Sequence, residues 1–442
     1  MAGGVGGPLL PDALQRQAHP LRPALAAEVH ARPPLPLAAP ARVLHLALML
    51  KPDEARAEYE HLVRLCRSCD ADEPPTGTKH VAVELSGAGH LIWERRTEFS
   101  TYTLYLPRNV GASLERPANE LPLPDGWLAA LPGQLMVAAD VTLLGAGESS
   151  PTAEQLDGIF DGPTMVASQV ADGRATVWTD FFLGADNTVR FLVHDNGVTD
   201  AQRGRIVMRL LDIETYRMMA LLALPLAQQV APRITALEQG LARLSSRMVD
   251  VEHESEQTLL LELASVAAEV ETLAVDTPYR FGAGRAYHAL VERRIAELRE
   301  ARIQGLPTIG EFMERRLSPA MRTCITMAER IEGLSRRATR MANLLRTRVD
   351  VALERQNVEL LNSMNQRSRL QLRLQETVEG LSVAAITYYV VGLVGYAAQA
   401  LHAVGLPVDK EIAIGVAIPV VAVVVWWALR RFRRSLVKDG LN

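Results

Sequence analysis

Polar or small side chains recur at alternating spacings of four and three residues near the C-terminus: Tyr388, Gly392, Gly395, Gln399 and His402. This spacing places them on one face of a helix. The residues around them are apolar, and polar groups at membrane depth face either a cavity or a neighbouring helix. The face therefore lines an ion path, with Gln399 and His402 near its outer mouth, or it packs against another helix. An inward continuation of the same stripe passes through Leu381 and Thr377.

Carboxylates lie at both ends of this stripe. Asp409 and Glu411 follow it, and in a ring of subunits they would concentrate cations at an external mouth. The same pair also fits an ordinary solvated turn. Glu376 and Glu379 precede the stripe and could form a ring at the cytoplasmic mouth. Alternatively, Glu376 pairs with Arg373 one helical turn earlier.

The remaining sequence offers little other chemistry. Cys66 and Cys69 form a C-x-x-C without the second ligand pair of a zinc site, and they close an expected helix where a redox pair would open one. His19 and His30 bracket a proline-rich arm that could join a metal site or dock on a neighbouring domain or subunit. Because the sequence has no phosphate-binding glycine loop and no nucleophile elbow, we expect no enzyme activity and no resident cofactor. A divalent cation enters only as a substrate or ligand.

Two apolar spans surround these residues. Residues 381–404 form the first expected transmembrane helix and residues 412–429 the second, with an external loop at 405–411. Arginines also precede the first span, and a basic tail at 430–442 follows the second. The positively charged topology anchors in this tail are Arg430, Arg431, Arg433 and Arg434. Since positive residues stay on the cytoplasmic side, we expect both termini and the large domain in the cytoplasm, at a bacterial inner membrane.

The chain before the hairpin is expected to fold in four parts. They are a proline-rich arm (1–41), a cytoplasmic α/β or α+β domain (42–200), a helical region (201–317) and a stalk helix (318–380). The second part consists of short β-branched segments bounded by turn residues, with one early helix, which indicates a mixed or antiparallel sheet with flanking helices. The helical region is expected to bend at Pro225 and Pro232.

Ser318 and Pro319 are expected to begin the stalk helix, as an N-cap and a proline in the first turn. A coiled-coil seam at three- and four-residue spacing is predicted along it: Ile331, Leu334, Ala338, Met341 and Leu345. The net charge of −4 and the lack of a basic stripe argue against nucleic-acid binding. Three cysteines in 442 residues indicate a reducing compartment without a disulfide framework.

This layout resembles the CorA/ZntB-type divalent-cation channels, in which a cytoplasmic α/β domain continues through a stalk helix into two spans and a basic tail. The resemblance implies a homo-oligomer, a pentamer by analogy, that conducts cations. Those channels carry Gly-Met-Asn at the outer end of the first span, whereas here no Met-Asn follows Gly395. Over the full length, HPLRPALAAEVHARPP (19–34) and TVEGLSVAAITYYVVGLVGY (377–396) are similar to signatures of an uncharacterised family of bacterial membrane-anchored proteins.

We therefore expect a homo-oligomeric inner-membrane protein in contact with the lipid bilayer. The first hypothesis is a CorA-like cation channel or transporter of unassigned selectivity. The alternative is a non-conducting membrane-anchored scaffold or sensor, in which the hairpin serves as anchor and oligomerisation device.

Overall fold

The computed structural model describes residues 14, 17–23, 25–26, 35–110, 121–249, 256–403 and 409–439, leaving aside the side chains at positions 257, 410, 429–430 and 432–439. The chain divides into two compact units. The first unit comprises Met1–Glu254 with Leu261–Met341, and the second comprises Ser255–Leu260 with Ala342–Asn442. The first contains a sheet domain and the second contains the apolar hairpin.

Within the described residues, the first unit is built on a nine-stranded mixed sheet of order β2-β3-β4-β1-β5-β8-β7-β6-β9. Neighbouring strands are antiparallel except for the parallel pair β5 and β8. The strands are β1 (Ala41–Met49), β2 (His80–Glu84), β3 (His90–Arg95), β4 (Phe99–Pro107), β5 (Gln134–Leu144), β6 (Val166–Val170), β7 (Ala175–Thr179), β8 (Val189–Asp195) and β9 (Ala301–Arg302). The expected mixed sheet with flanking helices is confirmed, while the two-residue β9 was not predicted.

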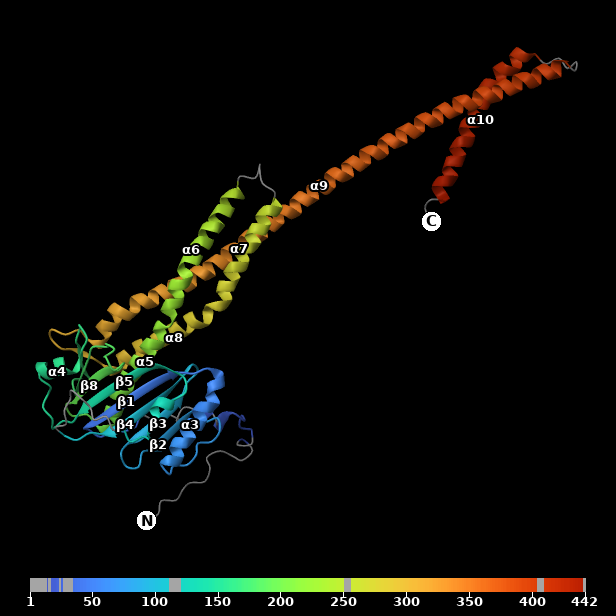
Figure 1. Ribbon diagram of the computed structural model, residues 1–442. Coiled ribbons are helices and arrows are strands. Elements are labelled where there is room, and N and C mark those ends of the chain that lie inside the picture. Colours follow the sequence, from blue (N-terminus) through green and yellow to red (C-terminus); the bar gives the residue numbers. More distant parts are fainter. Residues whose placement is uncertain are drawn as a thin grey trace. The chain divides into compact units, whose positions relative to one another are not determined.

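One face of the sheet is covered by helix α3 (Ala55–Ser68), which follows the short 3-10 turn η1 (Pro52–Glu54) (Figure 1). Alternate residues of the strands point toward this helix, as the two-residue period of a strand requires. The buried core here contains Leu62, Leu65 and Cys66 of α3 with Trp93, Tyr102 and Leu104 of the sheet. A carboxylate lies inside it: Glu58 accepts hydrogen bonds from Trp93 Nε1 (2.9 Å) and Tyr102 OH (3.0 Å) and pairs with Arg95.

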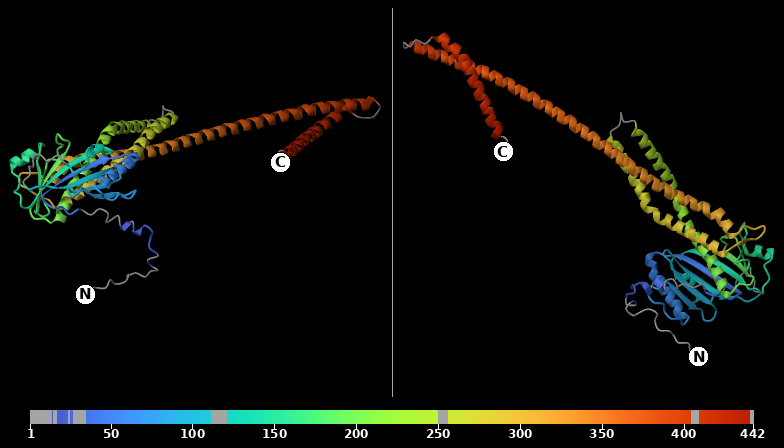
Figure 2. Two further views of the ribbon diagram at one scale, coloured as in Figure 1. Left: turned by 60° about the horizontal axis from the view of Figure 1, so that its bottom comes forward. Right: turned by 180° about the vertical axis from the view of Figure 1, so that it is seen from behind.

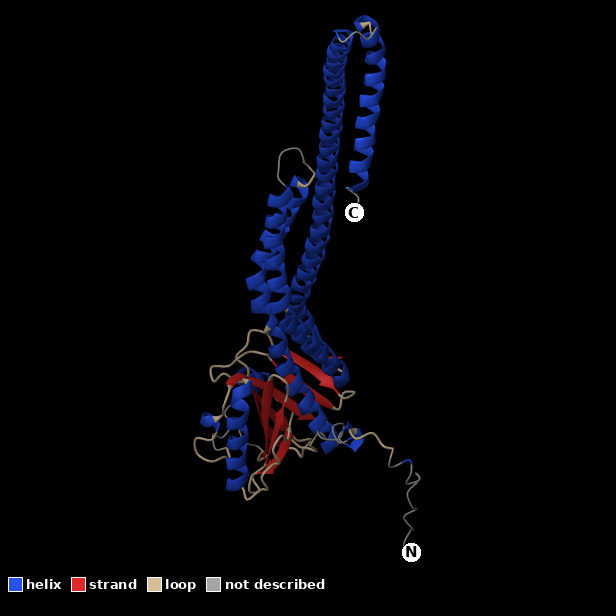
Figure 3. Ribbon diagram, turned by 90° about the vertical axis from the view of Figure 1, so that its right-hand side faces the viewer, coloured by secondary structure: helices blue, strands red, loops and turns tan. Residues whose placement is uncertain are grey.

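Helices lie on both sides of the strands (Figure 3). The opposite face is covered by helices α5 (Asp200–Leu221) and α8 (Pro278–Leu298). Thr199 begins α5 through a capping box with Gln202. Gly204 lets the segment at Leu35 pass close to α5, because a Cβ at position 204 would lie 2.0 Å from the carbonyl oxygen of Leu35. The short helix α4 (Ala153–Ile159) adds Ile159 to a second core cluster beside β6, β7 and β8, and η2 (Leu128–Ala130) precedes β5.

Helices α6 (Ala223–Arg247), α7 (Glu256–Asp276) and the first part of α9 (Ile309–Ala403) run beside one another in the first unit (Figures 1 and 2). Ion pairs tie them together: Arg247 Nη1 lies 2.5 Å from Glu262 Oε2, and Arg330 Nη2 lies 2.6 Å from Glu238 Oε2. In the helical region, where bends are expected at Pro225 and Pro232, the chain divides into α5 and α6 at Leu222, before Pro225, and Pro232 lies inside α6.

The predicted start of the stalk helix at Ser318 is wrong, because α9 begins at Ile309 and contains Pro319. The cap is Thr308, whose hydroxyl accepts from Glu311 N (3.2 Å) while Glu311 Oε2 accepts from Thr308 N (3.1 Å). Ser318 instead donates its hydroxyl to Glu314 Oε2 (2.9 Å), one turn earlier on the same helix. The reciprocal hydrogen bonds between Thr308 and Glu311 thus begin the helix ahead of Pro319, although a proline is common in the first turn of a helix.

The expected seam is buried by the chain itself: Ile331, Leu334 and Ala338 are at most 4% exposed. Arg330, next to Ile331, pairs with Glu238 of α6, so this side of α9 packs inside the first unit. The seam is therefore an intrachain helix contact, because an apolar stripe at this spacing can also face the core of its own chain.

The second unit contains the rest of α9 and helix α10 (Lys410–Asp439), which turns back beside it and diverges toward its C-terminus (Figure 2). Both helices contain a stretch long and apolar enough to cross a membrane, within Ile309–Ala403 and over Glu411–Ala428. The second predicted span, 412–429, falls inside α10, and residues 381–403 of the first fall inside α9, whereas Val404 lies outside the described residues.

We predict that Leu334→Glu destabilises the first unit by several kcal/mol, since it places an unpaired carboxylate at a buried position. Leu334 is 1% exposed. Thr339→Glu is the matched control, because it adds the same charge on an exposed side of the same helix. Thermal melting of the full-length protein in detergent measures the effect. Equal melting temperatures for the two variants would show that the seam is not a packed contact.

Candidate functional site

The predicted stripe of α9 divides between two environments in the second unit. Gly395 is buried, and a Cβ there would lie 3.0 Å from Cδ1 of Ile414 on α10. Ala398 and Ala417 are also buried, at 4% and 9% exposure, so small residues let the two helices approach. The other members of the stripe are exposed: Tyr388, Gly392, Gln399 and His402. The inward continuation at Leu381 and Thr377 is exposed as well.

The carboxylates at the ends of the stripe also have identified surroundings. Asp409 caps α10, because its Oδ1 accepts from Glu411 N (3.0 Å) and its carbonyl accepts from Ala413 N (3.0 Å). Glu411 and Glu376 are exposed, while Glu379 is partly buried. This capping role fits the ordinary turn, and an external mouth at Asp409 and Glu411 stays a prediction.

Of the topology anchors, Arg431 places its guanidinium over the ring of Trp427, at 5.2 Å from the centroid. This is a favourable cation–π arrangement next to an apolar span. Three others lie on α10 with side chains outside the described part of the structure: Arg430, Arg433 and Arg434.

The remaining sequence candidates show no assembled site. Cys66 is fully buried, and burial raises the pKa of its thiol, which opposes thiolate chemistry. Cys69 is the C-cap residue of α3. His19 is exposed and accepts from the amide of Leu21, whereas His30 lies outside the described residues. Among the side chains that the structure describes, no group of three or more His, Cys, Asp or Glu residues could hold a metal ion.

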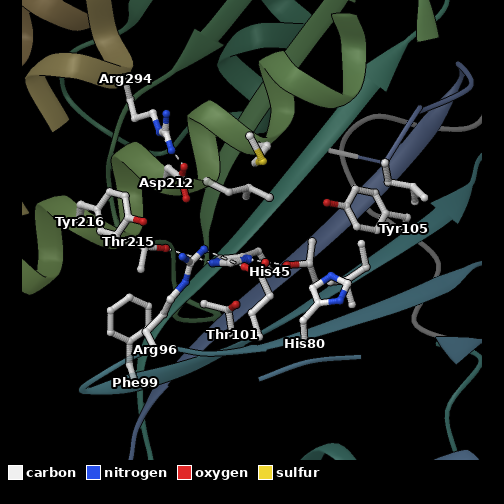
Figure 4. Close-up of a pocket in the computed structure, with 16 residues that line it drawn as sticks. His45, His80, Arg96, Phe99, Thr101, Tyr105, Asp212, Thr215, Tyr216 and Arg294 are labelled. Atoms are coloured by element: carbon white, nitrogen blue, oxygen red, sulfur yellow. Dashed lines mark hydrogen bonds and ion pairs between the residues drawn. The ribbon is translucent and has the colours of Figure 1, made fainter. Parts of the chain in front are cut away.

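A pocket that the sequence did not predict lies between the sheet and helix α5 (Figure 4). Its volume is about 190 Å³. The sheet wall contributes His45 of β1, Glu94 of β3, Arg96 just after β3, and Thr101 and Tyr105 of β4. The helical wall contributes Asp212, Thr215 and Tyr216 of α5 and Arg294 of α8.

Strand alternation produces the sheet wall. On β4, Tyr102 and Leu104 point toward α3, so Thr101, Thr103 and Tyr105 point toward α5. On the helical side, Asp212 and Thr215 are three residues apart, and Tyr216 follows, which puts them on one face of α5. Polar side chains thus occupy a sheet face that helices cover.

His45 joins the two walls. Its Nδ1 lies 2.8 Å from Thr103 Oγ1 and its Nε2 lies 3.0 Å from Thr215 Oγ1, so both ring nitrogens are hydrogen-bonded. Burial, with a smaller contribution from the positive charge of Arg96, lowers the pKa of His45 to about 3. The imidazole is therefore neutral at physiological pH, and one nitrogen donates while the other accepts.

Each wall carries one ion pair. Arg96 Nη2 donates to Glu94 Oε2 (2.8 Å) on the sheet side, and Arg294 Nε donates to Asp212 Oδ2 (2.8 Å) on the helical side. Burial raises the pKa of Asp212 more than the nearby arginines lower it. Burial also raises the pKa of Tyr216 and of Tyr105, so both phenols stay protonated. The pocket can therefore offer hydrogen-bond donors, acceptors and charges of both signs.

The sequence carries one sign of this pocket, in strand β4. In FSTYTLYL, Thr101 and Thr103 alternate with Tyr102 and Leu104 on a strand that is buried on both faces. Threonines on a covered face indicate polar partners opposite. The partners themselves lie on β1, α5 and α8, and nothing local to β4 identifies them.

Comparison with known proteins matches this chain to one protein family. The family described as "Protein of unknown function (DUF3422)" matches residues 17–436. No curated protein matches. A solved structure titled "structure of the full-length CmaX protein" has 13% sequence identity, with 81% of this chain and 100% of that chain covered and a TM-score of 0.21. A likeness at that level supports no conclusion about fold or function.

We predict that His45→Gln flattens the acid sensitivity of the protein. The folded-state pKa of about 3 lies below the ordinary 6.5, so only the unfolded state gains this proton as the pH falls below 6.5. The wild-type protein should lose about 2 kcal/mol of stability through this residue at pH 5, and the variant should not. Melting temperatures at pH 7 and pH 5 measure the difference. An equal drop in both proteins would mean that His45 titrates normally.

Proposed function

We propose that this chain, which belongs to the DUF3422 family, is a homo-oligomeric membrane protein anchored by the α9–α10 hairpin, with its sheet domain in the cytoplasm. The hairpin acts as a packed anchor, and the exposed part of α9 before it is the assembly surface. The protein then works as a membrane-bound scaffold or sensor, in which assembly holds several sheet domains together.

The observation that carries this proposal is a run of exposed apolar side chains on α9, ahead of the apolar span. They are Leu344, Val351, Leu353, Val358, Leu360, Leu361, Met364, Leu370, Leu372, Leu374 and Val378, none less than 43% exposed. Charged residues such as Arg348, Glu354 and Arg355 lie among them, so this stretch belongs in water and not in lipid. Exposed apolar surface of this extent on a helix in water favours a protein partner.

A second copy of the same helix is the partner that the spacing favours. Leu344, Val351 and Val358 are seven residues apart, the repeat by which identical helices pack along one seam. A helix with this repeat brings the matching face to its own copy without any other component. We therefore assign the surface to self-assembly.

The anchor role of the hairpin is supported by its internal packing. Gly395 of the stripe contacts Ile414, and Asp409 is used as a helix cap. Cytoplasmic orientation is supported by the arginines after the second span and by Arg431 on Trp427.

Reporters fused after Asn442 and before Met1 should both read cytoplasm, and one inserted at Pro407 should read the opposite side. A non-cytoplasmic signal at either terminus would reverse the assignment.

Cation conduction is a second candidate, favoured by the exposed members of the stripe. Gly392, Gln399 and His402 are exposed on α9 and available to face an axis between copies. The CorA-like layout supports this candidate too. The absence of Met-Asn after Gly395 argues against Mg²⁺ selection, so we propose a broader cation preference for any such path.

We predict that replacing Leu344, Val351 and Val358 by Ser abolishes the oligomer in detergent. Burying each of these side chains against a neighbour contributes about 1.5–3 kcal/mol per site. The matched control is Asn343→Ser with Asn357→Ser and Asn362→Ser, which changes exposed polar residues of the same stretch. Size-exclusion chromatography with light scattering reports the mass. A native-sized assembly of the apolar variant would remove the main support for self-assembly on this surface.

We predict no cation flux through purified protein in liposomes if the hairpin is only an anchor. Should flux occur, Gln399→Leu is expected to reduce it strongly, because it replaces an exposed polar group of the stripe by an apolar one. Leu393→Ala serves as the control, since Leu393 is an exposed apolar residue outside the stripe. Flux that depends on Gln399 and not on Leu393 would replace the scaffold assignment by the cation path.

A further inference from the structure

The pocket between the sheet and α5 has the features of a small-molecule site. Its volume of about 190 Å³ is below the roughly 300–1,000 Å³ of sites for drug-sized ligands, so its occupant is small. A second hollow of about 510 Å³ shares Arg96, Phe99 and Tyr216 with it. The two hollows are therefore neighbours that share these three side chains as a common wall, and Lys79 lines the second one.

The guanidinium groups in the pocket keep unused hydrogen-bond donors. Arg96 donates from Nη2 to Glu94, and within the described residues its Nε and Nη1 donate to no other group. Arg294 donates from Nε to Asp212 and from Nη1 to Glu297 (2.9 Å). Since a guanidinium has five N–H donors in a fixed fork, each arginine can still bind a ligand oxygen. Figure 4 shows Arg96 at the centre of the pocket, between the side chains of His45, Thr215 and Asp212.

The charges that line the pocket determine the class of ligand. Two guanidinium groups and two carboxylates cancel, and the lining also holds two imidazoles, His80 and the buried, neutral His45. A simple anion would be repelled by both carboxylates, and a simple cation would be repelled by both arginines. Neither kind of ion can therefore form favourable contacts with all four charged groups. A molecule with one group of each sign can use both walls, with its carboxylate on Arg96 and its ammonium on Asp212.

The pocket also has an aromatic surface that can contact the apolar part of such a ligand. Phe99 lines the pocket, and Tyr216 stacks on Tyr287 with ring centroids 5.8 Å apart, which fixes an aromatic surface beside Arg96. Aromatic rings held by their own packing form good contact surfaces for a side chain. Thr101 and Tyr105 add hydroxyls on the sheet wall.

We propose that this pocket binds a small zwitterion of the amino-acid type, with Arg96 holding its carboxylate and Asp212 its ammonium group. This site would let the sheet domain respond to a soluble metabolite. It is independent of whether the hairpin anchors, assembles or conducts.

The test uses full-length protein in detergent and the twenty common amino acids, one at a time, in thermal-shift and calorimetric measurements. At least one should bind with a stoichiometry of one per chain. Its analogues without the amino group or without the carboxylate should bind about ten-fold or more weakly, because each lacks one charge-assisted contact. Absence of binding by every amino acid, or equal binding of the carboxylic acid analogue, overturns the proposal.

Two variants test the assigned roles. Arg96→Gln should weaken binding of the amino acid at least ten-fold. Asp212→Asn keeps the size and a hydrogen bond to Arg294 but removes the charge, so the amino acid should then bind no better than its deaminated analogue. Arg67→Gln is the control, since Arg67 pairs with Glu73 at the surface, and it should bind as the wild type does. If Arg96→Gln fails to fold, the Asp212→Asn comparison still decides, and unchanged selectivity in that variant contradicts the assignment.

Discussion

His45 is hydrogen-bonded to Thr103 on the adjacent strand β4 and to Thr215 on helix α5, and all three side chains are buried. Buried polar groups without partners are costly, so these bonds favour one position of α5 over the sheet. Once Thr215 is placed, Asp212 and Tyr216 are placed as well, because they share its face of the helix. The charged pocket follows from this one contact between the walls.

The two faces of the sheet use buried charge differently. Under α3, Glu58 is completely buried and accepts from Trp93, Tyr102 and Arg95, so its oxygens are committed to the fold. Under α5, the arginines of both ion pairs keep donors that the described chain does not use. The same residue types are therefore structural on one face and available to a ligand on the other.

Helix α9 changes its environment along its length. Around Leu334 it is buried in the first unit, from Leu344 to Val378 its apolar side chains are exposed among charges, and beyond Leu381 charges are absent. Each stretch favours a different medium: protein interior, an interface in water, and lipid. The composition of a single helix thus supports both parts of the proposed function, assembly and anchoring.

Local patterns in the sequence determined the strands, most helices and the two apolar spans, because period, length and charge are properties of neighbouring residues. The same patterns could not decide what covers the seam at Leu334, or that Thr308 and not Ser318 caps α9, since caps and seams depend on competing contacts. They also could not assemble the pocket. His45, Arg96, Asp212 and Arg294 are far apart in the chain, and strand pairing with helix packing brings them to one cavity. Only the tertiary structure decided this site, because its energetics depend on which distant polar groups are buried together.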